Sequence, residues 1–272
     1  LPLGNPNLSN WKNMVDTILS DMPVVNIAIV GKYTEVPDSY LSVSEAIKHA
    51  ALKNKYKAHI DIISSEDIEV MQVKDVLKGY DGIVVPGGFG SRGIEGKIMT
   101  AKYCRENKVP YLGLCLGMQI ACIEFARNVV GLKDANSTEF DCDTQNPVIH
   151  IMNEQKFIQD KGATMRLGNY KCHLLDGTKV RQLYGMPDIV ERHRHRFEFN
   201  NDYADTFVKA GLTISGINDD KNLVEIIELK DHPFFVACQF HPEFKSRPYK
   251  PHPLFVGFVN QAIGNIKKSR LN

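Results

Sequence analysis

The segment YLGLCLGMQ, residues 111–119, places one cysteine between two glycines, after an apolar run and before a helical pattern. The letters GLCLG within it fit a G-x-C-x-G elbow, in which a strand turns sharply into a helix. The flanking residues must be small because the chain folds back on itself. The helix amino terminus would then stabilise a thiolate at Cys115. A buried core cysteine is the other interpretation, since free cysteines are among the most buried residues.

Apolar runs and helical patterns alternate on both sides of this segment. Strands are predicted at residues 24–33, 59–64, 82–88 and 110–116. Helices are predicted at residues 40–54, 72–78, 93–107 and 117–131. Such alternation with short connections is typical of a parallel sheet that helices cover on both faces. We therefore predict an α/β domain of the doubly wound kind with a mostly parallel sheet.

The two ends of the chain have different patterns. Residues 9–20 predict a short helix with one apolar face, and we interpret residues 1–23 as a linker that precedes a domain at 24–272. After residue 131 the pattern loosens, and residues 133–147 and the polar stretch 153–172 predict loops. Strand signals return at 223–229 and 234–240, and a closing helix is predicted at 253–268.

Composition limits the class of protein. The 272 residues include 33 basic and 32 acidic side chains, so the net charge is +1 and no general role on nucleic acid or membranes is indicated. No apolar run reaches the roughly 18 residues that a membrane span needs, and the chain does not begin with a secretion signal. The 6 cysteines form no CxxC pair, which predicts reduced thiols in a cytoplasmic protein and no zinc site.

Two further motifs follow predicted strands. In PGGFG, residues 86–90, the glycines allow a backbone N–H to point into a cleft, as an oxyanion hole requires; a simple turn is the alternative. In CQFHPEF, residues 238–244, Pro242 favours an extended His241, so that Glu243 lies on the same side as the ring. A carboxylate behind an imidazole fixes its tautomer while the imidazole activates a thiol. A surface His–Glu pair is the alternative, but the order Cys, His, Glu at strand ends favours catalysis.

The most basic stretch is ERHRHRFEFN, residues 191–200. Its alternating His193 and His195 resemble metal ligands, but no further ligand cluster accompanies them, so no metal site is predicted. Binding of phosphate or RNA and a solvated strand face are other interpretations. An arginine that binds an anion in a cleft is the one we favour.

Taken together, the motifs resemble those of the triad-type, class I glutamine amidotransferases. PGGFG, GLCLGMQ and CQFHPEF carry this resemblance. GKYTEVPDSYLSV, DANSTEFD, ATMRLG and ERHRHRFE narrow it to the glutaminase domain of CTP synthase, from about residue 24 to 262. The resemblance implies a flavodoxin-like class I glutamine amidotransferase fold with a nucleophile elbow.

The resemblance also implies a role for each matching position. Cys115 is similar to the nucleophile that attacks the glutamine amide, His241 to the base, and Glu243 to its orienting carboxylate. Gly88 and the backbone of Leu116 correspond to the oxyanion hole. The positions that match glutamine-binding residues are Gly88, Leu116, Gly117, Met118, Gln119, Glu139 and Arg196. Arg166 corresponds to a loop through which GTP activates the intact enzyme.

The implied activity is glutamine hydrolysis through a γ-glutamyl thioester. The ammonia would serve the ATP-dependent amination of UTP to CTP, a step of pyrimidine biosynthesis, in a synthase domain of the same polypeptide. Members of the family bind ATP, UTP and Mg²⁺ in that domain, and no phosphate-binding loop occurs here, so the chain is expected to be an isolated domain without its own cofactor or metal.

The intact enzyme is expected to be a homotetramer that GTP activates allosterically, without a nucleic-acid or membrane partner. Two other functions stay open at this point. One is another enzyme on this fold, such as a γ-glutamyl peptidase or a different amidotransferase subunit. The other is a catalytically silent regulatory or scaffold domain.

Overall fold

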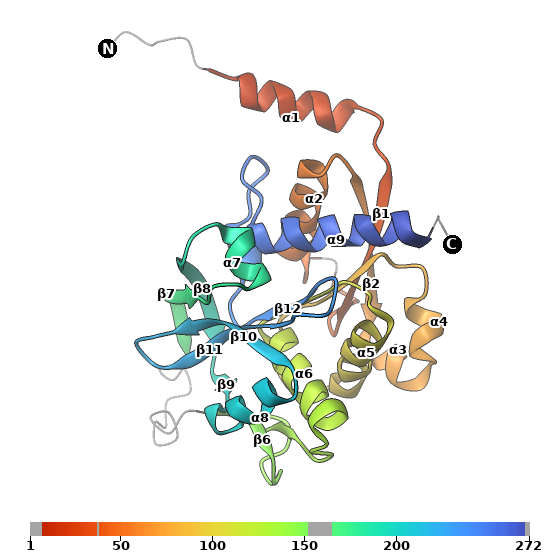
Figure 1. Ribbon diagram of the computed structural model, residues 1–272. Helices are drawn as coiled ribbons and strands as arrows, with labels where there is room; N and C mark the ends of the chain where they lie inside the picture. The colour runs from red at the N-terminus through yellow and green to blue at the C-terminus, as the bar shows by residue number, and fades with distance from the viewer. Residues whose placement is uncertain (1–6, 37, 152–164, 270–272) are drawn as a thin grey trace.

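The computed structural model describes residues 7–36, 38–151 and 165–269. Strands and helices alternate in its first half, as predicted from the apolar runs (Figure 1). In chain order these elements are β1 (Val24–Gly31), α2 (Leu41–Lys53), β2 (Lys57–Ser64), α3 (Ser65–Val70), α4 (Val73–Leu77), β3 (Gly82–Val85), α5 (Ile94–Asn107), β4 (Tyr111–Leu114), α6 (Leu116–Phe125) and the π-helical turn η1 (Ala126–Val130).

Nine strands form the main sheet in the order β2-β1-β3-β4-β12-β11-β10-β7-β8. The first five, which include β12 (Phe235–Cys238), are parallel to one another, and their order is that of flavodoxin-like sheets. The doubly wound α/β fold is therefore confirmed. Val85 pairs with Gly113, and Leu114 pairs with Cys238, so the carboxyl ends of β3, β4 and β12 meet at one edge. Residues that follow these strands are thereby brought together.

The other four strands are antiparallel and extend the sheet on the far side of β12. They are β11 (Leu223–Leu229), β10 (Leu212–Asn218), β7 (Arg166–Leu174) and β8 (Asp188–His195). Only β11 was predicted. The prediction of a loop over 153–172 is wrong for residues 166–172, which lie in β7; residues 152–164 lie outside the described residues. The apolar pattern of the sequence does not predict β7 and β8, because these strands direct charged and histidine side chains inward.

Helices cover both faces of the main sheet. Helices α2 and α9 (Pro253–Ser269) pack on one face together with α7 (Lys179–Tyr184), and α5 and α6 pack on the other. Beyond α6 lies a second, three-stranded sheet of β5 (Asn136–Ser137), β6 (Pro147–Ile151) and β9 (Phe197–Phe199). The remaining short elements are η4 (Asn201–Tyr203), α8 (Ala204–Lys209) and η5 (Pro242–Lys245).

Helix α1 (Ser9–Leu19) stands apart from these layers (Figure 1). None of its eleven residues is buried, and the ring of Trp11 lies 5.9 Å from that of Tyr249. The helix predicted at 9–20 is therefore confirmed, while its role as a linker stays a prediction. In the part of the chain that is described, no helix combines the length and the apolar character that crossing a membrane requires.

Candidate active site

Cys115 lies at a sharp strand-to-helix turn. It separates the last residue of β4 from the first of α6, and its backbone has φ 53° and ψ −102°, which is rare for a residue with a side chain. A Cβ on Gly113 would lie 2.7 Å from the carbonyl oxygen of Gly117, and one on Gly117 would lie 2.1 Å from that of Val85. Neither site can accept a side chain, so the glycines of the elbow are required by close backbone packing.

The elbow exposes the backbone of its helix. Leu116 is the first residue of α6, and its N–H therefore has no acceptor within the helix. Cys115 itself is only 4% exposed, and its own N–H donates to the carbonyl oxygen of Cys238, 2.8 Å away on the neighbouring strand. The turn is thus fixed to β12, and the first free N–H of α6 lies next to the thiol.

His241 and Glu243 follow β12 at the same edge of the sheet. The Nδ1 of His241 lies 2.7 Å from Oε1 of Glu243, as the sequence predicted for a carboxylate behind the ring. Pro242 begins the short helix η5, so Glu243 reaches the ring from a helical turn rather than from the extended chain that we expected. The backbone N–H of His241 donates to the carbonyl oxygen of Arg192 over 2.8 Å, which fixes the backbone at His241 to β8.

The ring of His241 faces the thiol. A Cβ on Gly87 would lie 3.0 Å from the His241 ring and 3.5 Å from Cβ of Cys115, so both side chains border the same glycine. Burial disfavours the imidazolium, but interaction with Cys115 and the hydrogen bond to Glu243 outweigh it and raise the pKa of His241 above its ordinary value. This environment favours a proton on the imidazole when the thiol is deprotonated.

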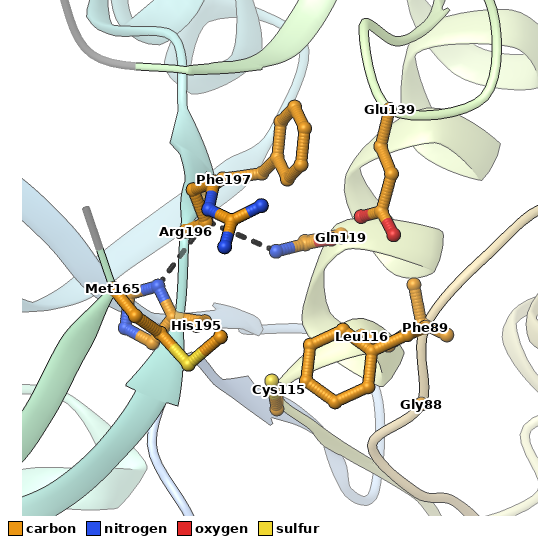
Figure 2. A pocket seen from close by; sticks show the side chains of 10 residues that line it. All are labelled: Gly88, Phe89, Cys115, Leu116, Gln119, Glu139, Met165, His195, Arg196 and Phe197. Carbon is orange, nitrogen blue, oxygen red and sulfur yellow. Dashed lines mark hydrogen bonds between the residues drawn. The ribbon is translucent and has the colours of Figure 1, made fainter. Parts of the chain in front are cut away.

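A cavity of about 100 Å³ opens beside the thiol (Figure 2). Of the residues predicted from the sequence, it brings together Gly88, Cys115, Leu116, Gln119, Glu139 and Arg196. A second cavity, of about 200 Å³, meets Cys115 and His241 from another side and also contacts Gly88. The thiol is therefore accessible from two cavities although it is almost fully buried.

The charged ends of Glu139 and Arg196 point toward the same space above Gln119 (Figure 2). Glu139 is half-buried, and its Oε1 accepts a hydrogen bond of 3.0 Å from the N–H of Gly90 in the PGGFG turn. Gln119 donates from Nε2 to the carbonyl oxygen of Phe197, 3.1 Å away. A carboxylate and a guanidinium so placed suit a small molecule that carries an ammonium and a carboxylate.

Three of the predicted residues line neither cavity. Gly117 packs against Val85, and the side chain of Met118 is fully buried in the core beneath α6, so only their backbones border the elbow. Arg166 is 2% exposed. Its guanidinium donates to Glu198 at 3.1 Å and to Glu225 at 2.7 Å, and thus points into the protein rather than toward a ligand at the surface.

His193 and His195 belong to a buried polar network next to Arg166. Nδ1 of His195 donates to the carbonyl oxygen of Phe197 at 3.2 Å, so Nε2 of His195 accepts from Nδ1 of His193 at 2.8 Å. Burial and the nearby Arg166 lower the pKa of His193 to about 2, which keeps the ring neutral. Within the described ranges, no three His, Cys, Asp or Glu side chains gather as metal ligands.

Several residues of the site were not predicted. Gln239 is buried beside the thiol, with its Nε2 3.8 Å from Sγ of Cys115. It stands two residues before His241, so the alternation of a strand could have revealed it. His195 and Phe197 line the cavity with Arg196, and their signal was only their adjacency to that arginine. Lys32 and Lys97 are both buried near Gly88; Lys32 lies in the motif GKYTEVPDSYLSV but was given no role, and Lys97 lies in none of the motifs.

Comparisons with known proteins agree with this geometry. The family described as "Glutamine amidotransferase class-I" matches residues 35–261. Among curated proteins, the "CTP synthase" of Caldanaerobacter subterraneus subsp. tengcongensis is 57% identical over 267 residues, which is 98% of this chain and 50% of that protein. The "CTP synthase" of Carboxydothermus hydrogenoformans is 56% identical over 97% of this chain and 49% of its own length. The chain thus spans about half the length of these relatives.

Solved structures give the same result. The glutaminase domain of Trypanosoma brucei CTPS with bound acivicin superposes with a TM-score of 0.83 at 39% identity, covering 88% of this chain and 94% of that one. A glutamine amidotransferase from Thermotoga maritima has a TM-score of 0.54 at 13% identity, over 89% and 97% of the two chains. The second match supports the fold alone.

Proposed function

Because the chain belongs to the class-I glutamine amidotransferase family, we propose that it hydrolyses glutamine with Cys115 as nucleophile, His241 as base and Glu243 as the carboxylate that orients the base. The observation that carries this proposal is the meeting of three strand ends. The elbow cysteine after β4 faces the imidazole after β12, and the 2.7 Å contact with Glu243 fixes that ring. Acyl transfer from an amide needs a nucleophile, a proton carrier and an oxyanion site in this arrangement.

The proposed reaction has two halves. Sγ of Cys115 attacks the side-chain amide carbon of glutamine while its proton passes to Nε2 of His241. The oxygen of the amide becomes an oxyanion, which the N–H groups of Gly88 and Leu116 would stabilise. When the intermediate collapses, the C–N bond breaks, and His241 returns the proton to the nitrogen, which leaves as ammonia. A water molecule, deprotonated by His241, then cleaves the thioester to give glutamate and the free thiol.

Specificity for glutamine would come from the cavity beside the thiol. We assign Glu139 to the α-ammonium and Arg196 to the α-carboxylate of the substrate, since their charged ends point into the same space (Figure 2). Gln119 would complete the floor of this site. A γ-glutamyl peptide, the main rival substrate, shares the γ-glutamyl part that these residues would bind, so direct assay of both substrates distinguishes them.

The fate of the ammonia follows from the named relatives. We propose that a synthase domain, in the half of the relatives that this chain does not span, uses it to convert UTP to CTP with ATP and Mg²⁺. No residue of this chain is assigned to the binding of UTP, ATP or Mg²⁺. Activation by GTP is proposed for the intact enzyme, and a role of Arg166 in it would act through Glu198 and Glu225, because its guanidinium is directed inward. The homotetramer and the cytoplasmic location stay predictions.

The test is an assay of glutamate release and CTP formation. We expect this chain to release glutamate from glutamine slowly, to leave γ-glutamyl peptides intact, and to make no CTP from UTP, ATP and Mg²⁺. Addition of a synthase domain should increase glutamate release, since a misplacement of about 1 Å at the oxyanion site costs roughly a hundredfold in rate. Faster cleavage of a γ-glutamyl peptide than of glutamine would replace the proposal by the peptidase function. CTP formation by this chain alone would overturn the assignment of UTP chemistry to another domain.

A further inference from the structure

A lysine is buried behind the residues assigned to the oxyanion hole. Lys97 lies in the first turn of α5, is 0% exposed, and has no hydrogen-bond partner for its Nζ among the described residues. A Cβ on Gly88 would lie 3.7 Å from this Nζ and 3.4 Å from Cδ2 of Leu116. The ammonium thus lies directly beneath the loop that carries one oxyanion donor and next to the residue that carries the other.

This placement is costly for folding. An ammonium removed from water without a hydrogen-bond acceptor destabilises the folded state, and buried lysines occur mainly where they are paired. Burial and the nearby Lys32 lower the pKa of Lys97 to about 7, while Cys115 acts in the opposite direction. Methionine, which has similar length and no charge, would fill the same space without this cost.

Lys32 provides an instructive contrast. It is also buried, at 3% exposure, but its Nζ donates to the carbonyl oxygens of Phe89, at 3.1 Å, and Gly90. These bonds hold the PGGFG turn in place, so the position of Lys32 is explained by structure. Lys97 makes no such bond within the described part of the chain, so no hydrogen bond found there explains why a charged side chain is buried at this position.

We propose that Lys97 is a positioning residue for the oxyanion: its buried ammonium acts through the Gly88 loop and favours the negative charge that develops when the thiol attacks. This inference rests on the proposed glutamine hydrolysis. A fixed cation at a buried position needs no reorganisation during the reaction and therefore stabilises the transition state more than the ground state. The expected consequence is an effect on kcat rather than on KM.

The test compares Lys97→Met with Lys102→Met, a matched change at an exposed position of the same helix. Below pH 7, where Lys97 holds its proton, Lys97→Met should lower kcat for glutamate release at least about tenfold with little change in KM. It should also raise Tm, because the buried charge is lost. A structural role for Lys97 predicts the opposite, a lower Tm together with lost activity. Lys102→Met should behave as the unmodified protein in both measurements.

A second readout uses covalent labelling of Cys115 by an electrophilic glutamine analogue, followed by mass spectrometry across pH. In Lys97→Met the labelling rate should fall, since a nearby cation favours the negative charge that develops when the thiol attacks. The charged and titratable groups that act on Lys97 are Lys32 and Cys115, and Cys115 in turn interacts with His241; all three are unchanged in the variant. Unaltered kcat and labelling in Lys97→Met would overturn the inference and leave the proposed function intact. If the unmodified protein is not labelled at Cys115 and does not hydrolyse glutamine, both this inference and the proposed function are overturned.

Discussion

The parallel and antiparallel halves of the main sheet contribute to the site in different ways. The parallel half ends in the PGGFG turn, the Cys115 elbow and His241, which are the groups assigned to bond making and breaking. The antiparallel half contributes Arg196, just beyond β8, and buries the network of Arg166, Glu198 and Glu225 behind it. Reaction chemistry is thus assigned to apolar strands that end in tight turns. The antiparallel half, whose strands bury charge, supplies Arg196 for substrate recognition, whereas Gln119 in α6 and Glu139 after β5 lie outside it. The predictions below test this division.

The largest effect is expected from the parallel half. Cys115→Ala should abolish glutamate release, because among the described residues no other thiol and no hydroxyl side chain lines the cavity, whereas Cys142→Ala, at an exposed position, should leave it unchanged. Glu243→Gln should retain measurable activity after a loss of up to about ten-thousandfold in kcat, since it impairs only the orientation of the base. Steady-state assays of the three variants measure this. Equal and complete loss in Cys115→Ala and Glu243→Gln would argue against separate roles.

In the antiparallel half, the largest expected effect is on stability. Arg166→Met leaves two carboxylates, Glu198 and Glu225, without their buried cation, and such a change costs about 3–5 kcal/mol. Lys171→Met, at an exposed position of the same strand, serves as the control. Denaturant unfolding gives the free energy of unfolding of each variant. A change below about 1 kcal/mol in Arg166→Met would show that this network does not support the strands.

A smaller, selective effect is expected at the cavity. Glu139→Ala removes the carboxylate assigned to the substrate ammonium and should raise KM about tenfold while kcat changes less. The matched control is Asp141→Ala, an exposed carboxylate two residues further along. Glutamine titrations of the initial rate separate the two constants. A large fall in kcat at constant KM would show that Glu139 acts in the reaction rather than in substrate recognition.

The smallest expected effect is a pH dependence at Lys97. Its folded-state pKa of about 7 lies below the ordinary 10.5, so between these values the unfolded chain holds a proton that the folded chain lacks. The free energy of unfolding contributed by this group therefore rises with pH in that window. The stability advantage of Lys97→Met over the unmodified protein should be greatest below pH 7 and shrink toward pH 10. Thermal unfolding at several pH values tests this, and an advantage that is constant with pH would contradict it.

The two halves also differ in how well the sequence predicted them. Continuous apolar runs revealed β1, β3 and β4, and the glycines beside Cys115 revealed the elbow. In β8 every second residue is buried, but the inward set includes Glu191, His193 and His195, so a search for apolar alternation misses it. The polar side chains of this strand are stabilised by partners far away in the chain, such as Glu225. That information is present only in the folded structure.

Within the site, too, contacts between residues far apart in the chain could not be predicted from the sequence. Cys115, His241 and Glu243 could be predicted because each lies in a short motif whose local geometry is set by glycine or proline. Lys97 could not be assigned, because only tertiary packing brings it to Gly88, and the strand alternation before His241 was the one signal for Gln239 beside the thiol. Short motifs therefore predict the reacting groups, and tertiary packing decides which residues support them.

The central claim, that Cys115 is the nucleophile of a glutamine-hydrolysing site, is tested most directly by mass spectrometry after treatment with an electrophilic glutamine analogue. The account predicts one covalent group, on Cys115 only. The buried Cys104 should not react, because burial raises its pKa well above the ordinary value, and the exposed Cys142 lies outside the cavity. Predominant labelling of Cys104 or Cys142, or an unlabelled Cys115, would contradict the account.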